Sequence, residues 1–250
     1  MANITASLPP AFSRRMHEIT PSHAEDIIAG LSVAKKVSAR INTLLATPEA
    51  VWPRLDPQWQ AQAVPWFNTG FSMPAHAKPA LVQSILCQQA RIYIQNPSSW
   101  LPVLLLVPGP DHQILDLAAA PGGKTMLLAT MGAQAENIAA VESVKSRFYK
   151  LKANLRKHGA AAVRTYHKNG RIVWRYRPQA FDRLLLDAPC SSEARFTTDD
   201  ESSYRFWREK KSRKWPESSW PYCCLHGAVC VQVGKWFIAR VRLRRKRMNR

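Results

Sequence analysis

The chain has 250 residues, of which 46% are hydrophobic and 21% charged. These proportions exclude a mainly disordered, collagen-like or fibrous protein, and the length allows one large domain or one domain with a small appendage. The longest apolar run, Leu101 to Val107, is far shorter than the roughly 20 residues that a membrane span needs. Five irregularly spaced cysteines do not suggest a disulfide framework, so we expect a reduced, cytoplasmic protein without a membrane partner.

The positive charge is concentrated at the end of the chain. The formal net charge is +19, and residues 205–250 hold 14 of the 36 lysines and arginines but only two acids, Glu209 and Glu217. A strongly basic protein favours polyanions, with nucleic acid as the first candidate partner, although charged residues also serve simply to solvate a surface.

The first third of the chain predicts a small α/β unit. Residues 1–35 have an amphipathic helical pattern, with Ser22 as the expected cap of a helix over 23–31. Residues 37–45 are strand-like, and six prolines divide residues 46–80 into short elements and loops. We therefore expect a separate N-terminal α/β domain over residues 1–90.

From residue 91 onward, strands and helices alternate. We expect a turn and helix over 93–106, a helix from the loop at 118–125 to residue 131, a helix over 145–158 that Gly159 ends, and strands over 112–117, 137–141, 162–166 and 181–187. Near-continuous apolar strands in this alternation predict an α/β, Rossmann-like domain whose parallel sheet is covered on both faces. Ligands of such sheets bind beyond the carboxyl ends of the strands, where Asp116 and Asn169 fall.

The loop at 118–125 allows two interpretations. Gly123-Lys-Thr125 resembles the end of a phosphate-binding P-loop, but Ala118 stands where that motif needs glycine and Pro121 lacks an N–H group. Alternatively, the small residues let the backbone approach a nucleoside cofactor, and Glu142 accepts its ribose hydroxyls from the end of the next strand. The second geometry fits a methyl donor and also NAD.

An aspartate and a cysteine lie together at the end of the last predicted strand, in Asp187-Ala-Pro-Cys190. Carbon-5 of cytosine becomes nucleophilic enough to accept a methyl group once a thiolate adds to carbon-6. A carboxyl group near N3 and the exocyclic amine can hold the base, and a basic group must then remove the carbon-5 proton. This pairing favours the methyl-donor interpretation over a buried, inert cysteine.

Two motifs together resemble those of the RsmB/NOP2/Sun family of RNA cytosine-C5 methyltransferases. They are Leu115-Asp-Leu-Ala-Ala-Ala-Pro-Gly-Gly-Lys-Thr125 and Leu186-Asp-Ala-Pro-Cys-Ser-Ser192, supported by Arg40-Ile-Asn-Thr43 and Tyr93-Ile-Gln-x-x-Ser-Ser99. The resemblance extends from about residue 8 to about residue 214. It implies methyl transfer from S-adenosylmethionine to an RNA cytosine, giving 5-methylcytosine, with 16S rRNA the expected substrate, tRNA an alternative and no metal.

The resemblance also implies roles for individual residues. The donor would bind Glu142, Asp187 and the loop residues Ala118, Ala119, Ala120, Pro121, Gly122, Gly123 and Lys124. Asn169 stands where the family has an aspartate on the adenine side. Asp187 would lie between donor and cytosine and Lys124 near the base, while Cys190 would assist breakdown of the covalent adduct rather than attack.

The chain departs from the family pattern after Trp215. The attacking cysteine of the family lies in a Ser/Thr-Cys motif on the next strand, and residues 216–250 contain no such motif, although 229–238 could form a strand. We expect an incomplete methyltransferase domain over 91–215 and an aberrant basic tail over 216–250, from a frame shift or, alternatively, an added RNA-binding arm. The expected consequences are an open sheet edge, poor stability, and donor binding with weak or no turnover; a non-catalytic RNA-binding remnant is the alternative.

Overall fold

The computed structural model describes residues 8–33, 35–170, 173, 180–187, 193, 196–198, 200–209, 229–233 and 236–240. The chain divides into two compact units. One combines Met1–Lys35 with Pro189–Ser219, and the other combines Lys36–Ala188 with Trp220–Arg250. None of the described helices is long and apolar enough to cross a membrane.

The first unit is built from short helices. Its elements are α1 (Pro10–Ile19), α2 (Ala24–Gly30) and the 3-10 turn η8 (Glu201–Ser203). They share a small core that contains Leu8, Phe12, Leu31, Phe196 and Tyr204. The helical prediction is confirmed, but Ser22 is not the cap, because α2 begins after His23 and no side chain caps it.

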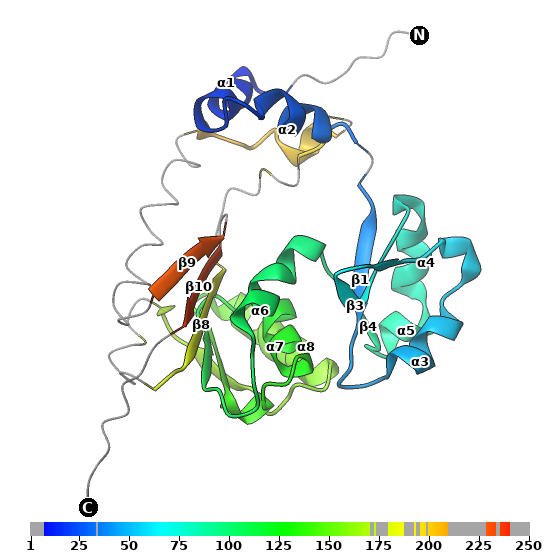
Figure 1. Cartoon of the computed structure of the whole chain (residues 1–250), viewed down its shortest axis with the longest axis vertical. Helices are drawn as coiled ribbons and strands as arrows, with labels where there is room; N and C mark the ends of the chain where they lie inside the picture. Colours follow the sequence, from blue (N-terminus) through cyan, green and yellow to red (C-terminus); the bar gives the residue numbers. More distant parts are fainter. Residues whose placement is uncertain are drawn as a thin grey trace, which may run out of the picture. The chain divides into compact units, whose positions relative to one another are not determined.

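A four-stranded antiparallel sheet opens the second unit (Figure 1). Its strand order is β2 (Gln62–Val64), β3 (Phe67–Met73), β1 (Val37–Ile41) and β4 (Ile92–Ile94). Three short helices pack on it, α3 (Pro48–Val51), α4 (Lys78–Gln83) and α5 (Ile85–Gln88), with 3-10 turns at 52–54, 57–59, 75–77 and 97–99. The expected strand over 37–45 ends at Ile41, because the chain turns at Asn42, and Tyr93 lies in a strand rather than a turn.

A six-stranded sheet forms the larger part of the second unit. Its order is β7 (Arg164–His167), β6 (Ile138–Glu142), β5 (Ile114–Asp116), β8 (Arg183–Asp187), β10 (Trp236–Arg240) and β9 (Val229–Val233). The first four strands are parallel, as the alternation predicts. The helices of this part are α6 (Leu101–Leu106), α7 (Gly123–Thr130) and α8 (Lys145–Lys157), with a 3-10 turn at 135–137.

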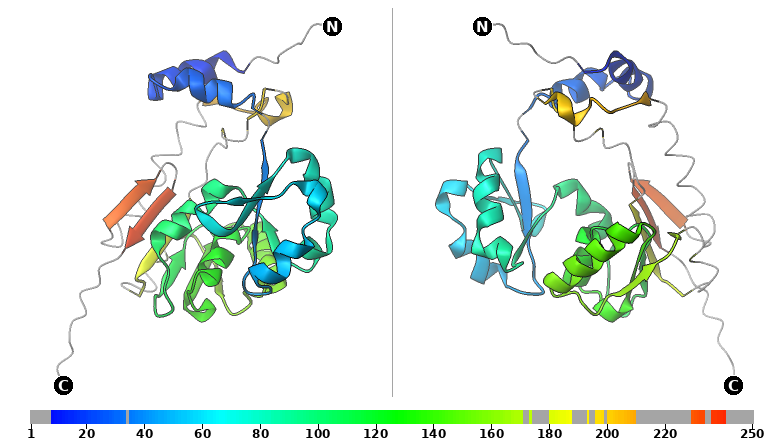
Figure 2. Two further views of the ribbon diagram at one scale, coloured as in Figure 1. Left: turned by 45° about the vertical axis from the view of Figure 1, so that its right-hand side comes forward. Right: turned by 180° about the vertical axis from the view of Figure 1, so that it is seen from behind.

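The two faces of this sheet have different partners. Ile114, Ile138 and Ala140 point into a core shared with buried residues of α6, α7 and α8. Because neighbouring strand residues face opposite ways, Leu115 and Ala139 contribute to a second apolar cluster on the other face. Figure 2 shows α8 lying alongside the sheet.

The expectation that β8 has an open edge is wrong. All five residues of β8 pair with β10, from Trp236 opposite Asp187 to Arg240 opposite Arg183. The strand considered over 229–238 is in fact part of an antiparallel hairpin, β9 and β10. The sheet therefore continues past β8 with strands of reversed direction.

Candidate functional site

The glycine-containing loop lies between the end of β5 and the start of α7. Gly122 caps α7 with a φ of 107°, a left-handed conformation that favours glycine. The loop is held from outside by three hydrogen bonds. The N–H of Ala119 donates to Val141 (3.0 Å), Arg147 Nη2 donates to the carbonyl of Ala120 (2.9 Å), and Asn154 Nδ2 donates to that of Pro121 (2.8 Å).

The small sheet also supports this loop. Arg40 and Asn42 are two residues apart at the end of β1, so their side chains point to the same side of the extended backbone. Arg40 Nη2 donates to the carbonyl of Gly123 (3.1 Å), at the start of α7. Asn42 Nδ2 donates to the carbonyl of His158 (3.0 Å), at the end of α8. The Arg-Ile-Asn sequence therefore attaches the small sheet to both helices that flank the loop.

Asp116, at the carboxyl end of β5, is fully buried. Its Oδ2 accepts a hydrogen bond from Thr125 Oγ1 at 2.8 Å, while Oδ1 is buried without a hydrogen-bond partner. Burial raises the pKa of Asp116 to about 6, and the Thr125 hydroxyl and nearby Lys124 oppose the rise. This carboxyl therefore offers an unused acceptor directly behind the loop.

Glu142 ends β6, the neighbouring strand, and only 2% of its surface is exposed. Its Oε1 accepts from the N–H of Val144 at 2.9 Å. Its Oε2 lies 3.5 Å from Arg147 Nη2, but it lacks a partner with hydrogen-bond geometry. A buried, ionisable oxygen with unused acceptor capacity is uncommon, and it is matched to a ligand that brings donor groups.

Lys124 and Asp187 meet at the end of β8. Lys124 Nζ lies 2.5 Å from Asp187 Oδ2, and the side-chain exposures are 12% and 29%. Lys124 reaches this position from the first turn of α7. The ion pair thus joins the loop to the second motif, with the carboxylate as its more accessible member.

The remaining sequence-predicted residues are placed only in part. Asn169 is exposed two residues after β7, at the same edge of the sheet as Glu142. Cys190 lies outside the described residues, so its predicted distance from Gly122 remains untested. The structure brings together the loop, Asp116, Glu142 and the Lys124–Asp187 pair.

The register of the hairpin separates Cys230 from this edge. Cys230 pairs with Ala239, which in turn pairs with Leu184. Leu184 is three positions before Asp187 on β8, which corresponds to about 10 Å along a strand. Cys230 therefore does not lie in the row of the sheet that contains Asp187.

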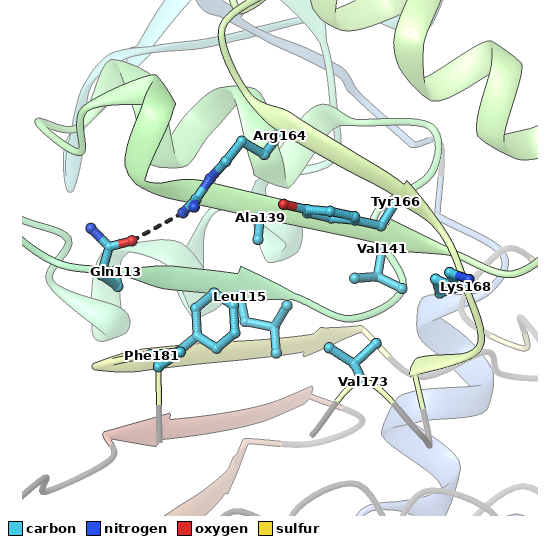
Figure 3. Close-up of a pocket in the computed structure, with 10 residues that line it drawn as sticks. Gln113, Leu115, Ala139, Val141, Arg164, Tyr166, Lys168, Val173 and Phe181 are labelled. Atoms are coloured by element: carbon cyan, nitrogen blue, oxygen red, sulfur yellow. Dashed lines mark hydrogen bonds between the residues drawn. The ribbon is translucent and has the colours of Figure 1, made fainter. Parts of the chain in front are cut away.

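A cavity of about 500 Å³ lies on the sheet face opposite α7 and α8 (Figure 3). Leu115, Val141 and Phe181 line it, and Arg164 donates a hydrogen bond to Gln113 Oε1 at its border (3.0 Å). Neither the glycine loop nor Asp187 contributes to its lining. It is thus separate from the candidate site.

Sequence reasoning did not assign roles to Asn42 and Arg147 in holding the loop. The available signal for Arg40 and Asn42 was the alternation of polar and apolar residues over 37–42, which places both side chains on the polar face. For Arg147, the signal was a basic residue in the first turn of a helix, where acids are favoured.

Two family models match the chain. One is described as 16S rRNA methyltransferase RsmB/F and matches residues 103–211. The other is described as the N-terminal domain of 16S rRNA methyltransferase RsmF and matches residues 8–97. Together they take in most of the chain, including both motifs.

Curated relatives with the corresponding name match the chain over part of their own length. Ribosomal RNA small subunit methyltransferase F of Aliivibrio fischeri (strain MJ11) is 34% identical over 206 residues, which are 80% of this chain and 44% of the relative. The protein of that name from Klebsiella pneumoniae (strain 342) is 36% identical over 201 residues, 77% of this chain and 42% of the relative. The chain thus spans less than half the length of these relatives.

Solved structures show the same fold. A methyltransferase homolog protein from Pyrococcus horikoshii is 27% identical with a TM-score of 0.63, covering 81% of this chain and 68% of its own. NSun6 from Pyrococcus horikoshii, solved with SFG, is 15% identical with a TM-score of 0.73, covering 88% of this chain and 80% of its own. The second likeness concerns the fold alone.

Proposed function

Because the chain belongs to the RsmB/F family of 16S rRNA methyltransferases, we propose that it binds S-adenosylmethionine at the glycine loop, in a site whose family-level function is methyl transfer to carbon-5 of an rRNA cytosine. The proposal extends to a cytoplasmic location, where ribosomal RNA is the substrate, and to an RNA-binding role for the N-terminal residues 1–90. The family favours rRNA over tRNA, and it favours a methyl donor over the nucleoside triphosphate of a P-loop protein.

Two buried carboxylate oxygens without hydrogen-bond partners carry the proposal. Asp116 Oδ1 and Glu142 Oε2 both lack hydrogen-bond partners at the ends of adjacent parallel strands. S-adenosylmethionine has ribose hydroxyls and an ammonium group, all of which donate hydrogen bonds. Glu142 is placed for the ribose hydroxyls, as acids at the end of a second strand often are, and Asp116 supplies a further acceptor beside the loop. The residues present therefore fit the donor.

The loop residues Ala118 to Lys124 would hold the remainder of the donor. Gly122 and Gly123 are buried and have no side chains, so the backbone can approach a ligand closely. An added Cβ on Gly123 would lie 2.9 Å from both Gln95 Nε2 and Tyr93 Cε1, so the space behind the loop is already filled. Asn169 would contact the adenine side with an amide in place of a carboxylate.

When bound, the donor supplies an electrophilic methyl group, and the protein must present cytosine to it. Asp187 is the exposed member of the pair with Lys124, so its carboxylate can accept a hydrogen bond from the exocyclic amine of the base. The Lys124 ammonium holds that carboxylate in place. Cys190 would assist release of the covalent adduct, which requires removal of the carbon-5 proton.

The thiolate that must add to carbon-6 has no assigned residue in this sequence. Cys223, Cys224 and Cys230 do not stand in a Ser/Thr-Cys setting, and Cys230 is remote from the Asp187 row. We therefore propose that this chain binds the donor but forms little or no covalent adduct with RNA.

Calorimetry with S-adenosylmethionine on the purified full chain tests the proposed function. We expect saturable binding with one site, and no binding of ATP or GTP with Mg²⁺. Failure to bind the donor in a chain that is folded by circular dichroism would contradict the proposal. Incubation with an RNA that contains 5-fluorocytidine, followed by denaturing electrophoresis, tests the chemistry, and a shifted covalent band would refute the expectation of little or no adduct.

A further inference from the structure

The outer face of α8 carries a stripe of basic side chains with one tyrosine. Lys145, Tyr149, Lys152 and Arg156 are spaced by four, three and four residues, which places them on one face of a helix over roughly 16 Å. All four are exposed, and Tyr149 retains 59% of its surface. The inner face of the same helix buries leucines against the sheet.

The sequence around α8 is rich in basic residues and contains no acidic ones. From Ser143 to Phe181 the sequence contains 11 lysines and arginines and no aspartate or glutamate. Helices that merely face solvent commonly pair acids with bases at i and i+4, and acids are favoured in the first turn. Here the first turn has no acid and begins with Lys145. Lys145 in the first turn is unfavourable to the helix dipole, whereas Arg156 in the last turn is favourable, so helix stability does not account for Lys145.

The exposed ring of Tyr149 and the half-buried ring of Phe148 accompany the cations. Phe148 lies against Tyr149 (centroids 5.8 Å apart) and against His167 of β7 (5.4 Å, interplanar angle 33°). Lys152 Nζ lies 6.0 Å from the Phe148 centroid. Positive charge that tracks a backbone, with aromatic rings on which bases stack, is typical of surfaces that bind single-stranded nucleic acid.

We infer that the α8 stripe, defined as Lys145, Tyr149, Lys152 and Arg156, binds a single-stranded segment of the RNA substrate. The choice of RNA rests on the proposed function. The basic side chains contact phosphates, and Tyr149 stacks on a base. The same helix holds the donor loop through Arg147 and Asn154, which lie on the opposite flank of the helix from the stripe.

Fluorescence anisotropy of the full chain with a labelled oligouridine of about 12 nucleotides tests the inference. Titrations at several salt concentrations give both the affinity and its salt dependence. The triple variant Lys145→Gln, Lys152→Gln, Arg156→Gln should lower the slope of log K against log salt by about 2, since each phosphate contact to a single strand contributes about 0.7. Glutamine preserves helix propensity.

A matched control removes the same charge elsewhere. Lys150→Gln, Lys157→Gln, Arg205→Gln changes three exposed cations that lie outside the stripe and outside residues 1–90. If the overall positive charge alone binds RNA, both triple variants will lose the same slope and affinity, and the inference is overturned. If the stripe binds, the control should change the slope by much less.

Tyr149 gives an independent readout. Tyr149→Leu should weaken binding by roughly 5- to 100-fold with an unchanged salt slope, because it removes a stacking ring but no charge. Tyr149→Phe should retain affinity. Equal affinity of the leucine and phenylalanine variants would overturn the stacking role. Donor calorimetry on each variant distinguishes failure of this inference from failure of the proposed function. If RNA binding does not respond to the substitutions but the donor still binds, only the inference fails.

Discussion

The guanidinium of Arg40 donates a hydrogen bond to the carbonyl of Gly123, 83 residues further along the chain. It also donates from Nε to Gln95 Oε1 (3.0 Å) and lies 5.3 Å from the centroid of the Tyr93 ring. The side chain is buried, burial lowers its pKa to about 10, and no salt bridge joins it to a carboxylate of the described residues. Nη1 has no hydrogen-bond partner. Burying this charge is energetically unfavourable, but its hydrogen bond to Gly123 fixes the position of the start of α7.

Arg40→Met should impair donor binding more than stability. Removing an unpaired buried charge offsets the lost hydrogen bonds, so we expect the free energy of unfolding to change by less than about 1.5 kcal/mol. Because Gly123 loses its anchor, donor affinity should fall about tenfold, or about 1.4 kcal/mol. Urea unfolding and calorimetry on the same preparation measure both quantities.

Ile41→Val is the matched control for Arg40→Met. Ile41 is equally buried on the same strand but belongs to the core of the small sheet, and its truncation should cost about 0.5–1.5 kcal/mol. Donor affinity should stay unchanged in this variant. An Arg40→Met protein that binds the donor as well as the Ile41→Val protein would show that the contact with Gly123 has no role in the site.

Glu142→Gln should weaken donor binding by roughly 10- to 100-fold, since hydrogen bonds to charged groups contribute about 1.5–3 kcal/mol. The amide still accepts from Val144 through its oxygen, but it replaces the free acceptor Oε2 with a donor. Glu136→Gln is the control, because Glu136 is exposed near the opposite end of β6. Calorimetry on both variants checks the prediction, and similar affinities for the two would argue against ribose binding by Glu142.

The pKa of Asp116 predicts a pH-dependent stability. Its folded-state pKa, about 6, lies above the ordinary value of 3.8, so the folded protein holds this proton more tightly than the unfolded chain. Stability contributed by this group should therefore be present below pH 4 and fall as the pH rises to 6, by up to about 3 kcal/mol. The charges around it, Lys124 and Asp187, oppose and reinforce the shift respectively.

Asp116→Asn isolates this effect from other titrations. The variant keeps an acceptor for Thr125 but cannot ionise, so its stability relative to the unchanged protein should rise between pH 4 and pH 7. Urea unfolding at three or four pH values measures the difference. A difference that is constant with pH would mean that folding does not raise the pKa of Asp116.

Gly70→Ala should destabilise the protein by about 1–3 kcal/mol through overpacking. Gly70 pairs with Arg40 in the small sheet, and an added Cβ would lie 2.7 Å from atoms of both Phe67 and Trp100. Trp100 is itself fully buried, which limits its ability to move. Thermal unfolding should show the loss, whereas Gly30→Ala, with open space around its Cβ, should leave the melting temperature unchanged or raise it.

The sequence was sufficient for the parallel part of the fold and for the residues at its edge. Asp116, Glu142 and Asp187 each end an apolar strand, and parallel strands bring such ends to one edge of a sheet. The position of Lys124 in the first turn of α7 could also be predicted, because Gly122 marks where the helix begins. These inferences depend on local pattern and a general rule of topology.

Contacts between segments that are distant in the sequence could not be predicted from the sequence pattern. The strand over Ile92–Ile94 has only three residues, and its pairing with β1, rather than any local period, defines it. The hydrogen bond from Arg40 to Gly123 joins the small sheet to the first residue of α7, so neither segment alone predicts it. The hairpin was not predicted for another reason: the largely apolar stretch 229–238 was considered as a single strand, although Gly234 within it is a turn signal.

The direction of β10 decides what can lie beside β8. Each backbone N–H and C=O on that side of β8 can serve one neighbouring strand at a time, and the described structure assigns this side to an antiparallel neighbour. A polypeptide that delivered a parallel strand to this place would have to displace β10 first. An added parallel strand and β10 would therefore compete for the same edge of β8. The strand that pairs with β8 more stably would occupy it.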